Sequence, residues 1–228
     1  MINNRLVYIS IILSGICLCL LIICPEWDIK FSQVFYNYYD GFIYRDNIVV
    51  RFLFLLIPPT TNLFVISCSI LFLIQLFMYK KFKKVPSLAV TYLLITALVG
   101  PGLVVNIALK ETFGRARPSQ ITEFGGVKHF TQATKITDQC KHNCSFSSGH
   151  AAMAYYYTAL SYCYSLSNKD KKIFTIIYII ALLFGTLTGF SRILMGGHFL
   201  SDVVASCFII LSINHLLFLC WKNKRRIT

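Results

Sequence analysis

Three short polar segments of this sequence contain side chains that could transfer a phosphoryl group through a histidine. They are the segment from Lys110 through Arg117 to Pro118 (KETFGRARP), the segment Ser148-Gly149-His150, and the segment from Ser191 and Arg192 through His198 to Asp202. Together they hold fixed cations, two histidines, a hydroxyl and a carboxylate. Phosphoryl transfer depends on positive charge around the equatorial oxygens and on a well-oriented nucleophile, and these residue types supply both.

His198 is the predicted nucleophile, because a neutral imidazole can attack phosphorus and hold the phosphoryl group covalently. Asp202 follows four residues later, and residues four apart on a helix share a face. We therefore predict that Asp202 accepts the ring N–H of His198 and fixes the reactive tautomer. A histidine that only packs in the core is the alternative, and the Ser191-Arg192 pair upstream argues against it.

His150 is the predicted general acid, which would protonate the leaving oxygen. It stands at the expected start of a helix, where free backbone N–H groups attract a phosphate. Gly149 would let the backbone approach closely, and Ser148 could add a hydroxyl donor. Taken alone, the Ser-Gly pair could simply mark the start of a helix and have no role in binding.

Lys110, Arg117 and Arg192 are predicted to hold the phosphate, since fixed cations in a water-poor site stabilise its charge. Arginine suits a site where two oxygens are gripped together. Arg115 and Lys128 receive no role, because cations near a membrane surface commonly extend their charged ends into water. The same alternative exists for Lys110 and Arg117.

The elements that must position these groups are membrane-spanning helices. The chain is 228 residues long and 56% hydrophobic, and its apolar residues form long runs. Runs of about 18 or more apolar residues indicate transmembrane helices. The expected fold is therefore an all-α integral membrane protein, a six-helix bundle forming one domain over residues 1–228. The six expected spans are Leu6–Cys24, Thr61–Tyr79, Leu88–Leu109, Ala151–Ser167, Ile173–Phe190 and Phe199–Trp221.

Basic clusters between the apolar runs predict the orientation of this bundle. With six crossings, Arg5 and the clusters around residues 80–84, 169–172 and 222–226 fall on one side, which the positive-inside rule makes cytoplasmic. Both termini are then cytoplasmic. The second and third polar segments are separated by two crossings and the first two by none, so all three should meet at the opposite, periplasmic face.

The segment from Pro25 to Pro59 has the least defined pattern. Its acids and aromatics are typical of an interfacial loop or amphipathic helix. The run Ile48–Ile57 is too short to span a membrane alone. It could extend the second helix through a proline kink or lie along the surface.

The net charge of +13 does not indicate nucleic-acid binding, because the cations cluster between apolar runs rather than on one basic face. No carboxylate cluster or matched ligand set suggests a metal, and no cofactor is expected. Cys140 and Cys144 share a polar loop and could form a disulfide in an oxidising compartment, or remain two reduced thiols.

The three segments, in this order and spacing, resemble the type 2 phosphatidic acid phosphatase (PAP2) superfamily over roughly residues 97–205. The resemblance implies a phosphohistidine mechanism that works without a metal. It places the phosphate site at Lys110, Arg117, Ser148, Gly149, His150, Arg192, His198 and Asp202. The family usually has proline before Ser-Gly-His, where this chain has Ser147, and the change removes no catalytic group.

The segments Gly100–Asn106 and Cys140–His150 are also similar to those of bacterial lipid A 4′-phosphatases. That resemblance implies removal of the 4′-phosphate of lipid A at the periplasmic side of the inner membrane, with resistance to cationic antimicrobial peptides as the result. Phosphatases of undecaprenyl pyrophosphate, of phosphatidylglycerophosphate and of the 1-position of lipid A stay open as alternatives. A membrane transporter and a lipid phosphotransferase are the alternatives from other classes.

Overall fold

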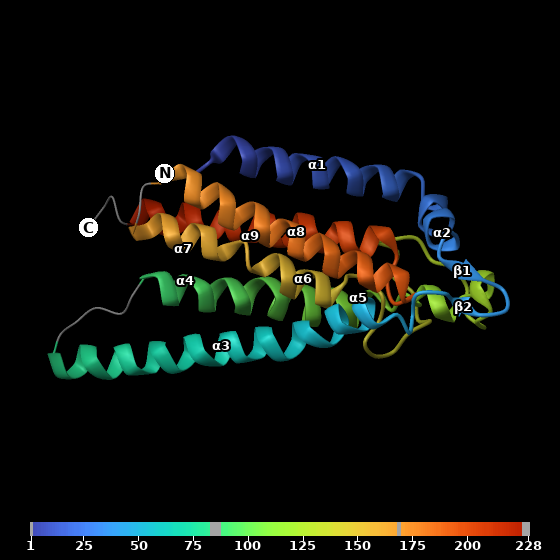
Figure 1. The fold of residues 1–228 in the computed structure, drawn as a ribbon, viewed down its shortest axis with the longest axis horizontal. Coiled ribbons are helices and arrows are strands. Elements are labelled where there is room, and N and C mark those ends of the chain that lie inside the picture. Colours follow the sequence, from blue (N-terminus) through green and yellow to red (C-terminus); the bar gives the residue numbers. More distant parts are fainter. Residues whose placement is uncertain (1, 83–87, 168–169, 225–228) are drawn as a thin grey trace.

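A computed structural model of the chain describes residues 2–82, 88–167 and 170–224. Long helices run side by side, and the short elements gather at one end together with residues 114–148, here called the loop end (Figure 1). The first turn of α1 (Asn4–Ile23) and the last turn of α9 (Leu200–Lys224) lie at the other end. Both ends of the chain therefore lie on the same side of the bundle, as an even number of crossings requires.

Five helices in the described part of the chain are long and apolar enough to cross a membrane. They span Asn4–Ile23, Ile48–Tyr79, Leu88–Gln120, Lys171–Leu194 and Leu200–Lys222. The remaining expected span, Ala151–Ser167, is divided into α6 (Gly149–Tyr156) and α7 (Ala159–Ser167). The hydroxyl of Thr158 donates to the carbonyl of Tyr155 at 2.8 Å in the turn between them. Such local side-chain bonds compete with the helix.

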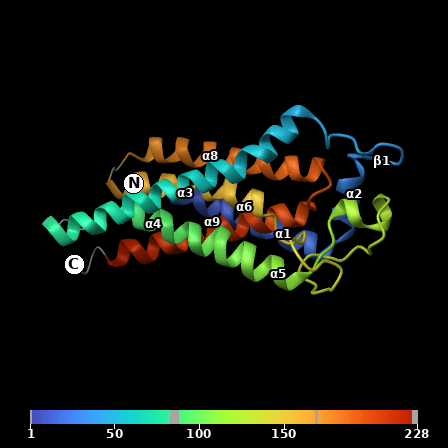
Figure 2. The same ribbon diagram turned by 90° about the horizontal axis from the view of Figure 1, so that it is seen from below.

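The run Ile48–Ile57 extends the second membrane helix, which settles one of the two expectations for it. It forms the first part of α3 (Ile48–Phe82), and Pro58 and Pro59 lie inside this helix. The hydroxyl of Thr60 donates to the carbonyls of Leu56 and Ile57, which gives the proline turn additional hydrogen bonds. As a result α3 reaches the loop end, where its first turns approach α6 and α8 (Lys171–Leu194) (Figure 2).

The segment between α1 and α3 forms a cap at the loop end. It contains α2 (Glu26–Gln33) and a hairpin of β1 (Tyr36–Asn37) and β2 (Gly41–Phe42), paired antiparallel. Asp28 and Ser32 on α2 are fully buried. The expected interfacial segment therefore packs inward on the bundle through polar side chains.

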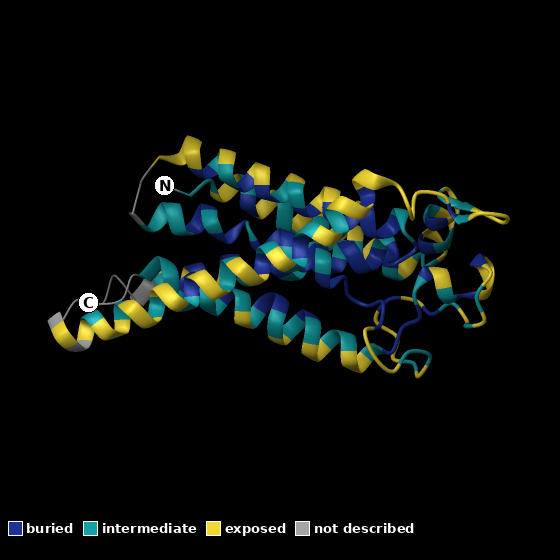
Figure 3. Cartoon of the chain, turned by 60° about the horizontal axis from the view of Figure 1, so that its bottom comes forward, coloured by how far each residue is buried: buried dark blue, intermediate teal, exposed yellow. Residues whose placement is uncertain are grey.

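The centre of the bundle is formed by α6 and α7, which pack against α8, α9 and α4 (Leu88–Ala97). Buried tyrosines fill it, and their hydroxyls are paired: Tyr92 donates to the carbonyl of Asn214 at 2.7 Å and Tyr156 to that of Leu93 at 2.9 Å. Exposed residues lie on the outer faces of the helices (Figure 3). Many of these exposed residues are apolar, as expected where lipid is the solvent.

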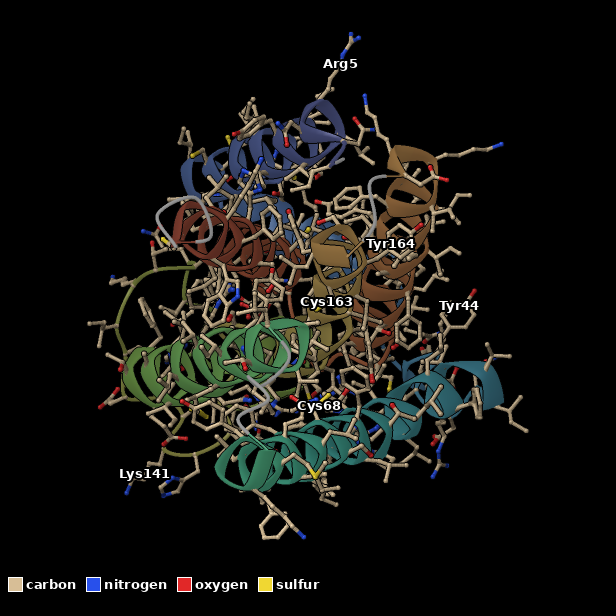
Figure 4. The ribbon with its side chains drawn as sticks, turned by 90° about the vertical axis from the view of Figure 1, so that its left-hand side faces the viewer. Arg5, Tyr44, Cys68, Lys141, Cys163 and Tyr164 are labelled. Atoms are coloured by element: carbon tan, nitrogen blue, oxygen red, sulfur yellow. A yellow bond between two sulfur atoms is a disulfide. The ribbon has the colours of Figure 1, made fainter. Side chains whose placement is uncertain are left out.

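The basic clusters are only partly described, because Lys83, Lys84, Lys169, Arg225 and Arg226 lie outside the described residues. Arg5 projects from the bundle at the end opposite the loops (Figure 4). The adjoining ends of α8 and α9 carry further cations of these clusters, at Lys171 and Lys222.

Candidate active site

The structure brings the three polar segments together at the loop end. Lys110 follows the π-helical segment η1 (Leu98–Leu109) and begins α5 (Lys110–Phe113). His150 lies in the first turn of α6, Arg192 in the last turn of α8, and His198 between α8 and α9. Helix ends therefore present the whole group at one side of the bundle.

His198 is oriented by a backbone carbonyl rather than by Asp202. Its Nδ1 lies 2.7 Å from the carbonyl oxygen of Ser145, but 3.7 Å from Oδ2 of Asp202. The expected direct hydrogen bond to Asp202 is therefore absent, because His198 precedes the helix on which the four-residue spacing would apply. A carbonyl can only accept, so Nδ1 carries the proton and Nε2 holds the free electron pair.

Asp202 uses its oxygens for other donors. Oδ1 accepts from Nη1 of Arg115 at 2.5 Å, and Oδ2 accepts from the hydroxyl of Ser145 at 2.5 Å and from the backbone N–H of Phe199 at 2.8 Å. It thus caps the start of α9 and holds Ser145, whose carbonyl orients His198.

His150 stacks on Phe54 of α3, with ring centroids 4.7 Å apart. Its Nε2 is buried and has no hydrogen-bond partner among the described residues. Burial, together with the positive charge of Arg192, lowers the pKa of His150 to about 3. A bound phosphate would oppose these cations, so the imidazole would become a proton donor only with the substrate in place.

The guanidinium of Arg192 also packs on Phe54, 4.3 Å from the centroid of its ring. Its Nη1 contacts the sulfur of Met195, while its Nε is buried without a partner in the described part of the chain. A Cβ at Gly197 would collide with this guanidinium. Glycine at this position therefore leaves room for Arg192 to reach the centre of the site.

Lys110 and Arg117 are held from one residue of the loop before α6. Nζ of Lys110 donates to Oδ1 of Asn143 at 3.0 Å. Nε and Nη2 of Arg117 donate to the carbonyl of Asn143 at 3.2 and 2.8 Å. A Cβ at Gly149 would lie 3.1 Å from Nζ of Lys110, so the glycine allows close approach of this cation to α6.

Ser148 is the N-cap of α6 and is fully buried. Its hydroxyl oxygen accepts from the backbone N–H of Ala151 at 3.4 Å, and its own N–H donates to the carbonyl of Asp202 at 3.2 Å. The backbone N–H of Ser148 is therefore used inside the fold, and only the hydroxyl hydrogen stays available to a ligand.

Cys140 and Cys144 form a disulfide in the structure. The five-residue loop that it closes contains Asn143, which adopts a positive φ of 52°. Since Asn143 anchors both Lys110 and Arg117, the disulfide restrains two of the cations predicted to bind phosphate.

Removing this disulfide should weaken substrate binding. In the double variant Cys140→Ser and Cys144→Ser, the KM for a lipid phosphate should rise by about tenfold, because small displacements of positioning groups are costly. Reductant should have the same effect on the wild type and none on the double variant. Cys24→Ser, which changes a free cysteine, is the control. An unchanged KM in the double variant would mean that Asn143 needs no disulfide.

Acidification should destabilise the protein through its buried histidines. Burial lowers the pKa of His198 from 6.5 to about 4. Between these pH values the unfolded chain binds a proton at this position and the folded chain does not, so the free energy of unfolding falls as the pH falls. Thermal midpoints in detergent, measured from pH 7 to 4.5, should show a shallower slope for His198→Asn than for the wild type. Equal slopes would contradict the shifted pKa.

Sequence reasoning missed several residues of this site. Arg115 is 1% exposed and pairs with Asp28 and Asp202, so its interpretation as a water-facing interfacial cation is wrong. Its position two residues before Arg117, in a motif already assigned to the site, was an available signal. No sequence signal pointed to Asp28 or Phe54, which lie outside the three segments.

Within the described ranges, no group of three or more His, Cys, Asp or Glu side chains could hold a metal ion.

Comparison with known proteins identifies the family of this chain. Residues 87–226 match the model of the PAP2 superfamily. A lipid A 4′-phosphatase of Francisella tularensis subsp. novicida is 35% identical over 191 residues, which cover 80% of this chain and 81% of that protein. A lipid A 4′-phosphatase of Rhizobium leguminosarum is 40% identical over 109 residues, which cover 48% of this chain and 45% of that protein.

A solved structure has the same fold. The crystal structure of a transmembrane PAP2-type phosphatidylglycerolphosphate phosphatase from Bacillus subtilis aligns with a TM-score of 0.53 at 21% identity, covering 95% of this chain and 96% of that one. The helical membrane fold expected from the sequence is thereby confirmed. The matched family model, the relatives and this shared fold together show that the chain belongs to the PAP2 superfamily and is a membrane phosphatase.

Proposed function

We propose that this protein removes the 4′-phosphate of lipid A at the periplasmic face of the bacterial inner membrane, through a phosphohistidine and without a metal. The observation that carries the mechanism is the orientation of His198, whose Nε2 is free because Nδ1 donates to the carbonyl of Ser145. The names of the relatives support the choice of lipid. The loss of negative charge would confer resistance to cationic antimicrobial peptides.

In the first step, the electron pair on Nε2 of His198 attacks phosphorus. The bond between phosphorus and the sugar oxygen breaks, and its electron pair leaves with the oxygen, which takes a proton from His150. The imidazole of His198 then carries both the phosphoryl group and the Nδ1 proton, and so bears a positive charge. Lys110, Arg117 and Arg192 offset the charge of the equatorial oxygens.

In the second step, water attacks the phosphoryl group and gives a proton to the neutral His150. The bond between phosphorus and Nε2 breaks, and its electron pair returns to the ring of His198. The products are inorganic phosphate and a sugar hydroxyl. His150 has its proton back, and the site is restored.

A lipid substrate suits the surroundings of the site. An apolar groove of about 590 Å³ runs between α3, η1 and α6, and Asn106 lies on its wall. Asn106 also lies beside Gly149, where a Cβ would approach its Oδ1 to 2.8 Å. Acyl chains could occupy this groove while the phosphate enters the site at the loop end. The proposed orientation has both termini in the cytoplasm and the loop end in the periplasm.

Phosphate release from a panel of lipids tests the proposal. Purified protein in EDTA would be offered lipid A, undecaprenyl pyrophosphate, phosphatidylglycerophosphate and phosphatidic acid, and mass spectrometry would locate the lost phosphate. Loss of the 4′-phosphate of lipid A, with slow turnover of the others, is the expected result. Preference for another lipid would replace the substrate, and transfer of phosphate to an alcohol without free phosphate would indicate a phosphotransferase.

A further inference from the structure

A buried ionic cluster of Asp28, Arg115 and Asp202 lies directly behind His198. Nη2 of Arg115 is 2.8 Å from Oδ2 of Asp28, and its Nη1 is 2.5 Å from Oδ1 of Asp202. The three side chains are at most 1% exposed. Burying charges is unfavourable unless each is paired and hydrogen-bonded, so the contacts of each member decide whether the cluster is stable.

Every nitrogen of the Arg115 guanidinium has an acceptor. Nε donates to the carbonyl of Thr131 at 2.7 Å, and Nη1 also donates to the hydroxyl of Ser201 at 2.9 Å. The plane of the group packs on Phe199, 4.2 Å from the ring centroid. These contacts fix the guanidinium in one place between the two carboxylates.

Asp28 joins the cap to the start of α9. Its Oδ1 accepts the backbone N–H of Ser201 at 2.8 Å, and its Oδ2 accepts the hydroxyl of Ser201 at 2.5 Å. Ser201 adjoins Asp202 in the first turn of α9. Asp28 therefore fixes the backbone beside Asp202 as well as the arginine in front of it.

The cluster reaches His198 through Ser145. The hydroxyl of Ser145 donates to Asp202, its backbone N–H donates to the carbonyl of Arg115 at 2.9 Å, and its carbonyl accepts from His198. Ser145 is thus held by two members of the cluster, Asp202 and Arg115, and in turn holds His198. A shift of either one would move the carbonyl that sets the tautomer of His198.

Charge gives Asp28 a second effect. Asp202 and Arg115 alone would sum to zero, so an ionised Asp28 makes the cluster net negative. Burial raises the pKa of Asp28, whereas the charge of Arg115 and the hydrogen bond from Ser201 oppose that rise and favour the ionised form. The positive charges of Arg192 and Arg117 disfavour a positive charge on His198, whereas Asp202 favours it. His150 is also close enough to this ring for the two imidazoles to interact. A ring that becomes cationic on attack is stabilised by a fixed negative cluster behind it.

We propose that Asp28 and Arg115 are positioning residues for His198: Arg115 bridges the two carboxylates, and Asp28 keeps the cluster fixed and net negative. This inference rests on the proposed function, in which His198 is the nucleophile. Asp28 lies outside the three polar segments, so the cap between α1 and α3 becomes part of the machinery that orients the nucleophile.

Kinetics of Asp28→Asn tests the proposal, with Asp46→Asn as the matched control, because Asp46 forms an exposed pair with Arg51. The kcat of Asp28→Asn should fall by about ten- to a hundredfold, since one preorganised charge is lost. Its KM and its inhibition constant for inorganic phosphate should stay within about twofold, because the phosphate-holding cations are untouched. An unchanged kcat, or equal losses in kcat and phosphate binding, would overturn the proposal.

Titration of His198 gives a readout that does not depend on turnover. In protein labelled with ¹⁵N-histidine, His198→Asn identifies the resonance, and the measured pKa of His198 should be lower in Asp28→Asn than in the wild type. An equal pKa would overturn the electrostatic part of the proposal. If the wild type releases no phosphate from any lipid, the proposed function fails, while this titration still tests the cluster.

Ser201→Ala covers the case in which Asp28→Asn does not fold. It removes the hydroxyl that donates to Asp28 and accepts from Arg115, but leaves the three charges in place. Its kcat should fall several-fold with phosphate inhibition unchanged, because Asp28 and Arg115 each lose one restraint. A kcat equal to that of the wild type would contradict the positioning role.

Discussion

Replacing His198 with alanine should lower phosphate release by about 10⁴-fold or more, because the residue proposed to form the covalent intermediate is lost. The fold should persist. The side chain hydrogen-bonds to the carbonyl of Ser145, and leaving that carbonyl unpaired costs about 1–3 kcal/mol. His198→Asn offers a donor to the same carbonyl and should be equally inactive. Purified variants would be compared by phosphate release and by thermal midpoint.

His129→Ala is the matched control, since His129 is an exposed histidine at the same end of the bundle. It should retain the rate of the wild type. Trapping the reaction with ³²P-labelled substrate should label the wild type at histidine and leave His198→Ala unlabelled. Normal turnover by folded His198→Ala would refute the phosphohistidine mechanism at this residue.

Replacing Arg192 with alanine should lower kcat by about 10²–10³-fold, the usual loss when one preorganised contact to a transition-state charge is removed. Arg192 is 5% exposed, and its Nε has no partner among the described residues, so Nε can donate to a phosphate oxygen. Arg192→Lys should recover part of the rate, because it restores the charge but not the two-pronged grip.

Arg45→Ala controls for the loss of a cation, since Arg45 is an exposed arginine in the cap. Its rate should equal that of the wild type. We expect kcat to be highest in the wild type, lower in Arg192→Lys and lowest in Arg192→Ala. Full activity of Arg192→Ala would show that Lys110 and Arg117 are sufficient to hold the phosphate.

The membrane-spanning helices could be predicted well from the sequence. A span must be apolar to cross the bilayer, and basic clusters mark the ends of the spans. The sequence also predicted that three distant polar segments would meet at one end, since that follows from counting crossings. It could not predict that the fourth span would divide at Tyr157 and Thr158, because the apolar character of the run continues through the break. At this point the hydroxyl of Thr158 donates to the carbonyl of Tyr155, and this local bond competes with the regular helix.

The candidate site was predicted in its residues but not in all of its contacts. The spacing of His198 and Asp202 suggested a direct pair, yet α9 begins only at Leu200, and Asp202 is engaged by Arg115 and Ser145 instead. Asp28 was beyond prediction, because a single acid in an amphipathic segment normally faces water. Only the packing of α2 on α9 makes it a buried partner of Arg115.

Phe54 contacts both His150 and Arg192 from α3, a helix that carries many exposed apolar side chains. A bilayer that is too thin or too thick for a helix makes it tilt, and a tilt of α3 would carry this ring with it. His150, the proposed general acid, and Arg192, which is proposed to bind phosphate, would then move together. We therefore expect the thickness of the surrounding membrane to affect the rate of phosphate release, because α3 connects the bilayer to the site through the ring of Phe54.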